Sequence, residues 1–240
     1  MFGVKLNDDT LLSSLGLLGN QLRGSSSMGG GGGSHPNIVL DTYTSSSSTQ
    51  SPSITIGNNS NRLLIATIGY SIVASESVSS VKIGSTNFTK ASSITISGGN
   101  FYQDVWYLIN PPTGAETVAV TFASGSPDYA IGLISLYNCD QTNGINASSL
   151  ATAGGLSNTT RSVAITPTNT GSWLIMGGID EAGNVTPATN LYNQIDSSGT
   201  SFFEGGSYNS SPTINSSNTF SWTASGTGHW NAIAVEVLRA

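Results

Sequence analysis

Short apolar runs separated by polar turns dominate the chain from about residue 37 onward. Residues 63–68 are apolar on both sides of an extended chain, as in a strand that is buried on both faces. Val118, Val120 and Phe122 instead alternate with smaller or polar residues. Turn residues return about every 8–12 positions, and no segment has the period of a long amphipathic helix. This pattern predicts an antiparallel β-sandwich.

The order of strands and turns occurs twice. Residues 53–66 comprise a strand, a polar turn and a core strand, and residues 163–176 repeat that order. The closing hairpins also match, residues 118–132 resembling residues 219–233. We therefore expect one all-β, antiparallel double-sheet sandwich, similar to a jelly roll and built from two pseudo-repeated halves. Two small sandwiches in tandem are the alternative.

Composition divides the chain into three predicted parts. These are an N-terminal anchor or oligomerisation segment (1–24), a Gly/Ser linker (25–36) and the β-sandwich (37–240), whose half-repeats span about 53–140 and 163–240.

The first part carries an apolar stripe at helical spacing. Four leucines recur at intervals of four, three and four residues: Leu11, Leu15, Leu18 and Leu22. Gly16 and Gly19 lie between them, and each costs about 1 kcal/mol relative to Ala, so this helix should not be stable alone. We expect it to dock on identical subunits or in a groove of another protein. A frayed tail, or a helix packed on its own β domain, is the alternative.

The linker contains five consecutive glycines, residues 29–33. A phosphate-binding loop would need a Lys after the glycines, a preceding strand and a following helix, and the lysine and that context are missing. The glycine run is therefore typical of a flexible linker. His35, beside it, has no second ligand at metal-binding spacing.

Charge is sparse, at 8% of residues, and the net charge is −6. The basic residues occur singly: Lys5, Arg23, Arg62, Lys82, Lys90, Arg161 and Arg239. Nucleic acid and anionic membrane surfaces attract clustered cations, so neither is an expected partner. No apolar run approaches bilayer length, and we expect no membrane insertion. If Met1 is the native start, the chain lacks an export signal, which favours assembly inside a cell and later exposure on a virus particle.

Candidate chemical groups are few. The two histidines are His35 and His229, and no Gly-x-Ser-x-Gly motif occurs. Asp180 and Glu181 are adjacent on a predicted strand, so they point to opposite faces and cannot flank one bond. We expect them to end a strand in solvent. We predict no enzymatic activity, no catalytic residue, no cofactor and no metal site, although a structural calcium ion stays open.

Other single residues have structural interpretations. Cys139, the one cysteine, ends an apolar run and should be a small buried hydrophobe. Trp222 and Trp230 should pack in the core. Phe101 and Tyr102 follow a glycine-containing turn and are the candidate glycan-binding residues.

These segments resemble a module widespread in bacterial surface proteins and phage virion proteins. The resemblance covers about residues 53–240 and rests on a core strand after an Asn-containing turn (61–65), an aromatic strand running into prolines (105–112), a valine hairpin strand, an apolar strand ending near Cys139 and a closing strand (230–237). It implies a lectin-like β-sandwich used for display or attachment.

The expected function is that of a structural virion protein of a tailed phage: a capsid decoration protein, head fibre or tail-associated adhesin on the virion surface. Its expected partners are identical subunits and other virion structural proteins, and attachment to a host-surface glycan is left open. The alternatives are a subunit of an extracellular cell-surface filament assembled through its N-terminal segment, and a carbohydrate-binding module or polysaccharide-active enzyme.

The leucine stripe can be tested by substitution. Burying each leucine is worth about 1.5–3 kcal/mol, which outweighs the two internal glycines. Changing Leu15 and Leu18 to Ser should therefore abolish association, measured by light scattering and a particle-binding assay, while circular dichroism shows a folded β domain. A double mutant that assembles as well as wild type would exclude the stripe as the anchor.

Overall fold

The computed structural model describes residues 35–71, 76–95, 100–125, 127–155, 159–182, 186–187, 190–196 and 203–240. Pro36–Ala240 form one compact unit. All regular structure in the described ranges is antiparallel β-strand, which confirms the predicted all-β sandwich class. The same residues contain no helix long and apolar enough to cross a membrane.

The described residues of the first half form nine strands in two sheets. The larger sheet has the order β1-β9-β3-β7-β6 and the smaller has the order β2-β8-β4-β5. The strands are β1 (Val39–Ser46), β2 (Ser53–Ile56), β3 (Leu63–Ser71), β4 (Val78–Ile83), β5 (Thr86–Asn87), β6 (Thr89–Thr95), β7 (Phe101–Ile109), β8 (Gly114–Phe122) and β9 (Tyr129–Tyr137).

The second half repeats this plan. Its larger sheet has the order β10-β17-β12-β15-β14, and its smaller sheet has the order β11-β16-β13. The strands are β10 (Ile145–Gly155), β11 (Thr160–Ile165), β12 (Trp173–Asp180), β13 (Thr186–Pro187), β14 (Leu191–Asp196), β15 (Phe203–Asn209), β16 (Asn218–Thr223) and β17 (Trp230–Val237). The two larger sheets have the same strand order when β1 is matched with β10 and β9 with β17.

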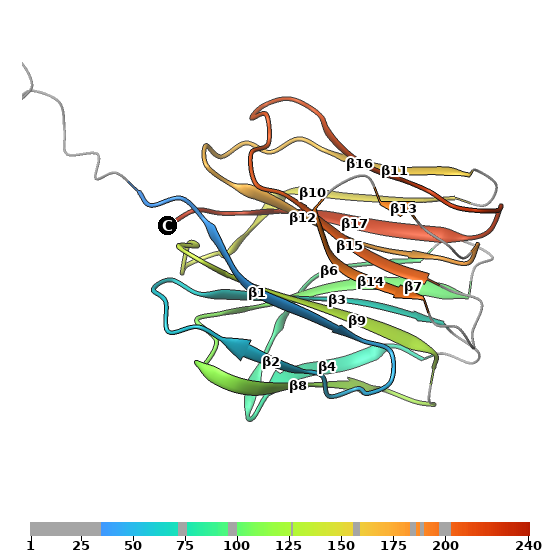
Figure 1. The fold of residues 1–240 in the computed structure, drawn as a ribbon, viewed down its shortest axis with the longest axis horizontal. Helices are drawn as coiled ribbons and strands as arrows, with labels where there is room; N and C mark the ends of the chain where they lie inside the picture. Colours follow the sequence, from blue (N-terminus) through green and yellow to red (C-terminus); the bar gives the residue numbers. More distant parts are fainter. Residues whose placement is uncertain are drawn as a thin grey trace, which may run out of the picture. The chain divides into compact units, whose positions relative to one another are not determined.

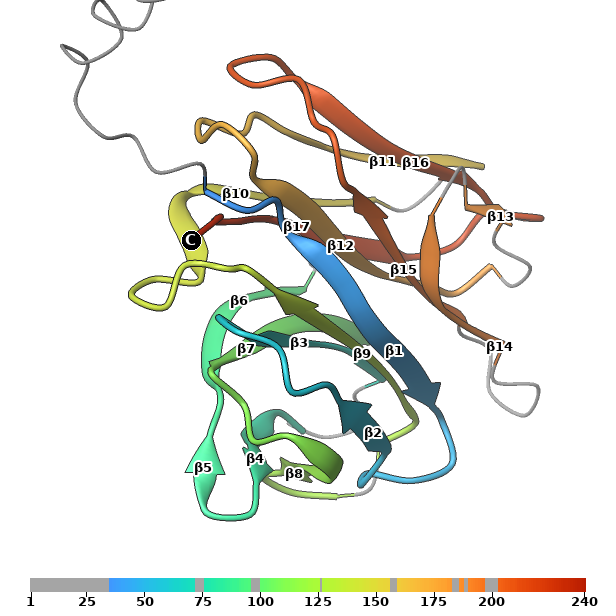
Figure 2. The same cartoon turned by 60° about the vertical axis from the view of Figure 1, so that its left-hand side comes forward.

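The four sheets of this unit lie in layers (Figures 1 and 2). The two larger sheets are in the middle, and the smaller sheets, with β2 and β8 on one side and β11 and β16 on the other, are outermost. Each half is thus a double-sheet sandwich, and the two halves share a third core between their larger sheets. The pseudo-repeated halves of the prediction are present in this form.

The central strands are buried on both faces. In β3, Leu64 and Ile68 pack toward the smaller sheet of their own half. Leu63 and Ile65 point the other way and pack against β12 and β17 of the second half. All eight residues of β12 and of β17 are buried for the same reason. The uninterrupted apolar run at 63–68 is therefore the sequence of a strand between two layers.

The two middle sheets approach closely where a glycine replaces a side chain. A Cβ built on Gly177 of β12 would lie 2.6 Å from Cγ2 of Thr67 of β3. Cβ of Thr67, which moves only with its backbone, would lie 2.7 Å away, so a side chain at this position would force the two sheets to shift. Glycine at this position therefore allows the two larger sheets to approach this closely.

The turn after β2 is held by a carboxylate from β1. The backbone N–H of Gly57 donates to Oδ2 of Asp41 at 2.8 Å, and the amide of Asn59 donates to Oδ1 at 3.2 Å. The hydroxyl of Ser135 on β9 also donates to Oδ2, at 3.0 Å. The carboxylate of Asp41 thus holds the turn backbone, the Asn59 side chain and strand β9 together.

The equivalent turn after β11 is also held by a carboxylate. This one comes from β17, the counterpart of β9, and not from β10, the counterpart of β1. Glu236 of β17 is fully buried and accepts the backbone N–H of Asn169 at 2.8 Å and of Thr168 at 3.1 Å. Asn146 of β10 donates to it at 2.8 Å. Glu236 and Ser135 occupy equivalent positions in the two halves. Each directly precedes the residue that pairs with the first residue of the central strand: Val237 pairs with Trp173, and Leu136 pairs with Leu63. The carboxylate that holds the turn therefore comes from β1 in the first half and from β17, the counterpart of β9, in the second half.

The electrostatics of Glu236 follow from these contacts. Burial acts to raise its pKa, but the donors from Asn169, Asn146, Ser172 and Thr168 outweigh burial and lower it. The contribution of this carboxylate to stability is therefore present above the ordinary carboxyl pKa, and it is lost as pH falls through the lowered value of the folded protein.

Glu236→Gln tests this assignment. The variant turns an acceptor toward backbone N–H groups into a partial donor, so we expect the free energy of unfolding to fall by about 2–4 kcal/mol at pH 7. The difference from wild type should narrow as pH falls below the ordinary carboxyl pKa and through the lowered pKa of Glu236, where this carboxylate becomes protonated. Denaturant unfolding between pH 3 and pH 7 measures both effects. A difference that stays constant with pH would contradict the assignment.

Candidate functional site

Pro36–Ala240 has two unlike ends. At one, which we call the terminal end, Asn138 donates to the carbonyl of Asn37 at 2.8 Å and accepts from the N–H of Ala240 at 3.0 Å. At the other, the loop end, β3 and β12 finish and β7, β9 and β17 begin. Figure 1 shows the chain entering β1 at the same end as the C-terminus. The described part of the chain therefore enters and leaves on one side.

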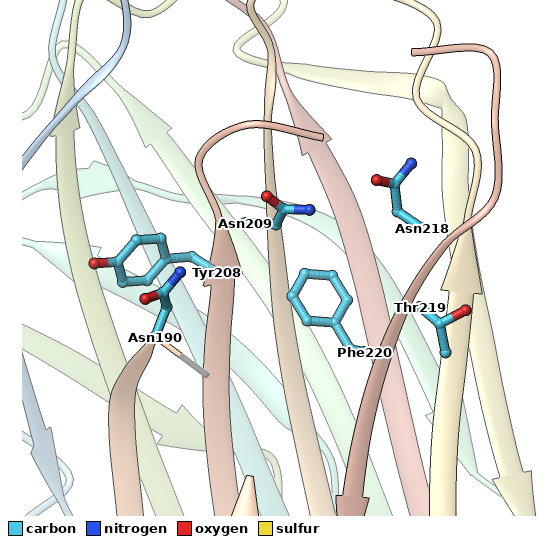
Figure 3. Close-up of a pocket in the computed structure, with 6 residues that line it drawn as sticks. All are labelled: Asn190, Tyr208, Asn209, Asn218, Thr219 and Phe220. Atoms are coloured by element: carbon cyan, nitrogen blue, oxygen red, sulfur yellow. The ribbon is translucent and has the colours of Figure 1, made fainter. Parts of the chain in front are cut away.

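A pocket of about 180 Å³ opens between the two sheets of the second half (Figure 3). It lies between β15 and β16, and its lining consists of Asn190, Tyr208, Asn209, Asn218, Thr219 and Phe220. The phenyl ring of Phe220 lies between the side chains of Asn209 and Thr219 in this view. None of the lining residues is charged.

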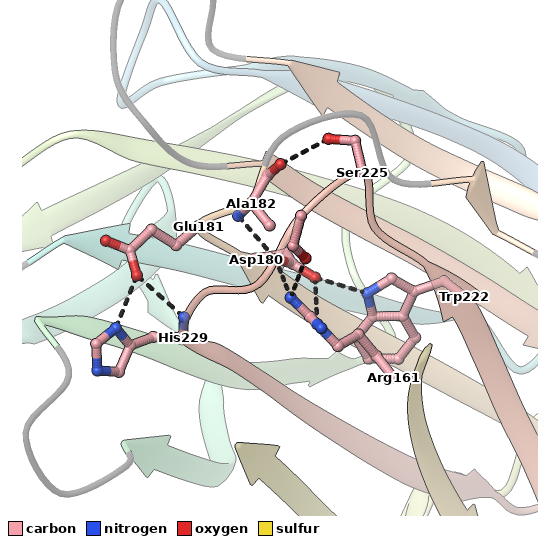
Figure 4. A network of polar contacts seen from close by, with 8 residues as sticks. Arg161, Asp180, Glu181, Ala182, Trp222, Ser225 and His229 are labelled. Carbon is pink, nitrogen blue, oxygen red and sulfur yellow. Dashed lines mark hydrogen bonds and ion pairs between the residues drawn. The ribbon is translucent and has the colours of Figure 1, made fainter. Parts of the chain in front are cut away.

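A buried ion pair lies at the loop end of the second half (Figure 4). Arg161 of β11 donates to Asp180 of β12 through Nε at 2.9 Å and through Nη2 at 3.2 Å, and neither side chain exceeds 2% exposure. The indole of Trp222 donates to the same carboxylate at 3.1 Å, and so does the N–H of Ala182 at 2.9 Å. Four donors occupy Asp180, which suits a structural anchor better than a base.

The expectation that Asp180 ends its strand in solvent is wrong. Its side chain is buried because β12 lies between two layers, so a residue at the end of this strand is covered by β11 and β16. The inference that Asp180 and Glu181 point in opposite directions agrees with their partners, which are Arg161 and His229.

Glu181 forms a second, more exposed pair. Its Oε2 lies 2.7 Å from Nδ1 of His229 and accepts the backbone N–H of the same residue at 3.0 Å. Burial acts to raise the pKa of Glu181, but these hydrogen bonds and the charge of His229 lower it. The pair joins the end of β12 to the start of β17. It therefore closes the loop end of the second half.

The same place in the first half is filled by aromatic rings. Tyr70 pairs with Tyr129 in register as Asp180 pairs with Trp230. Tyr70 stacks on Tyr102 with 5.5 Å between ring centroids and meets Phe122 edge-on at 5.4 Å. Burial, with the nearby charge of Asp104, raises the pKa of Tyr70.

The two candidate glycan residues lie at this end and make structural contacts. Phe101 packs against Ala130 and Ile179, and its carbonyl accepts the amide of Asn231 at 2.7 Å. Tyr102 is half-buried in its stack with Tyr70. Phe101 therefore bridges the halves, whereas Tyr102 belongs to one of them. Glycan binding by either remains a prediction.

Other predicted residues are placed as follows. Cys139 is fully buried in the core between the halves, which confirms its interpretation, and burial next to Asp140 raises its pKa to about 12. Trp222 and Trp230 are core residues, as predicted. The anchor leucines (Leu11, Leu15, Leu18 and Leu22) lie outside the described residues. Within the described ranges, no three His, Cys, Asp or Glu side chains gather as a metal site would require.

The sequence interpretation missed Arg161. This arginine shares its phase with Val163 and Ile165 in a strand whose alternate residues are exposed. The alternation therefore places Arg161 on the inward face of the strand, where a charged side chain is unfavourable unless it is paired. A cation at an inward position was the signal that could have predicted a buried acidic partner.

Comparison of the chain with protein-family models, curated proteins and solved structures finds no match in any of the three. The geometry of the described residues therefore carries the functional argument.

Asp180→Asn and Glu181→Gln form a matched test on neighbouring residues. Asp180→Asn leaves Arg161 buried without its counter-charge, and we expect it to cost about 3–5 kcal/mol of unfolding free energy. Glu181→Gln breaks an exposed pair and should cost less than about 1 kcal/mol. Thermal and denaturant unfolding of both variants measure the difference. Equal losses would contradict a structural role confined to Asp180.

Proposed function

We propose that the protein is a non-enzymatic display module, a structural protein carried on the surface of a tailed-phage particle. The duplicated sandwich is the displayed body, and the N-terminal segment with its glycine linker is the attachment. The observation that carries the proposal is the meeting of Asn37 and Ala240 on Asn138. A body tethered from this end presents its loop end away from the support.

The use of the ionisable groups supports a structural protein. Asp41 and Glu236 hold turns, and Asp180 neutralises Arg161. Asp104 is fully buried and pairs with Lys90 at 2.8 Å. Each of these carboxylates is occupied by donors from its own fold, whereas a general acid or base must be open to a substrate.

The polar surface suits crowded display. Exposed positions of the outer strands β2, β8 and β11 are mainly Ser, Thr and Ala, as in the pattern of β11 with Thr160, Ser162 and Ala164 outward. Such a surface is hydrated by hydroxyl groups and carries little charge. Neighbouring copies therefore repel one another weakly.

Removal of residues 1–36 tests the attachment. The truncated chain keeps the compact unit almost complete, so its melting temperature should equal that of the full chain. In lysates of the producing host, the full chain should sediment with virion-sized particles and the truncated chain should remain in the soluble fraction. The full chain is the matched control in the same gradient.

Two results would contradict the proposal. Sedimentation of the truncated chain with particles would place the attachment in the sandwich. Turnover of a glycan or peptidoglycan substrate by the purified full chain would show an enzyme in place of a display module.

A further inference from the structure

The two halves differ at one edge, between the larger and the smaller sheet. In the first half, β4 runs into β5, and Phe88 follows that hairpin and is buried at 5% exposure among residues of β7 and β8. In the second half, β13 is only two residues long, and three residues separate it from β14. Phe88 directly precedes β6, whereas the residue that directly precedes β14 is Asn190, which is exposed.

The strand next to this edge, β7 in the first half and β15 in the second, also carries smaller side chains in the second half. In the first half, Trp106 and Leu108 of β7 pair with Ala66 and Leu64 of β3. In the second half, the equivalent positions of β15 hold Ser207 and Asn209, which pair with Met176 and Leu174 of β12. Two large apolar side chains of the first half are thus replaced by smaller polar ones in the second half.

The pocket between β15 and β16 occupies this edge. Its volume of about 180 Å³ exceeds the roughly 150 Å³ of a protein cavity that accepts benzene, so one six-membered ring fits. Phe220 is 8% exposed and contributes an apolar floor. The remaining lining is carboxamide, hydroxyl and backbone.

The carboxamides are fixed in place before any ligand arrives. Asn218 accepts the N–H of Thr213 at 2.9 Å through Oδ1 and donates through Nδ2 to the carbonyl of Thr213 at 2.8 Å. Asn209 accepts the N–H of Ser211 at 3.0 Å. A carboxamide oxygen accepts two hydrogen bonds, so each Oδ1 retains one site for a hydroxyl donor. Preorganised polar groups of this kind lower the cost of binding.

We propose that this pocket binds one ring of a neutral sugar, as found at the end of a glycan chain. Hydroxyl groups of the sugar donate to Oδ1 of Asn209 and Asn218, and an apolar face of the ring lies on Phe220. A sugar acid is disfavoured, because the lining offers no cation to its carboxylate.

The internal repeat supplies the test variant. Asn209→Leu restores the side chain that the first half has at Leu108, which fills the pocket and removes one acceptor. Binding of neutral methyl glycosides (glucoside, galactoside, mannoside and N-acetylglucosaminide) and of methyl glucuronide as the charged probe is measured by NMR titration of the full chain. We expect at least one neutral glycoside to bind with a Kd on the order of 1 mM and to shift the amide signals of Asn218 and Phe220.

Asn209→Leu should weaken that binding about tenfold or more without lowering the melting temperature. Thr55→Leu, on the exposed face of β2, is the matched control and should leave the affinity unchanged. Tyr102→Ala tests the loop end of the first half as the alternative glycan site.

Three results would overturn the proposal. The first is that no neutral glycoside shifts the pocket signals, and the second is that the glucuronide binds more tightly than every neutral probe. The third is that affinity survives Asn209→Leu but is lost in Tyr102→Ala. None of these results affects particle attachment, which is measured by sedimentation.

Discussion

The contact between the two larger sheets is the interaction on which the rest of the structure depends. Leu63, Ile65 and Ile134 of the first half face Ile175 and Val235 of the second across one core. Burial of each such side chain stabilises the fold by about 1.5–3 kcal/mol, and separation of the halves would expose all of them together. The halves are therefore two sandwiches in topology and one unit in energetics. Gly177 allows the necessary approach where Thr67 lies opposite.

Within this shared frame the halves solve the same local problems with different residues. The turn after the first strand of each smaller sheet needs an acceptor, and a carboxylate supplies it from Asp41 in one half and from Glu236 in the other. Both positions lie near the same turn because the registers agree, so either strand can supply the charge. The loop end shows the same freedom: rings around Tyr70 fill the first half, whereas the pair Arg161 and Asp180 fills the second.

This division explains where function can reside. The middle sheets are constrained on both faces, and the ionisable groups near them are committed to turns and ion pairs. The outer edges are packed on one face only. The second half can therefore lack a large buried side chain at the place where Phe88 fills the first half. A cavity at such an edge disturbs few contacts of the central core. The open edge of the second half is therefore a place where a binding site costs little stability.

The sequence by itself determined the strands, their repetition and the faces of the most apolar ones. Residues 63–68 and Cys139 were predictable because a period of two and an uninterrupted apolar run reflect local geometry. The sequence did not determine that Asp180 is buried, that Glu236 holds a turn or that a pocket opens beside Phe220. Each of these depends on the register of strands far apart in the chain and on which layer covers them, and that information is present only when the sheets are packed.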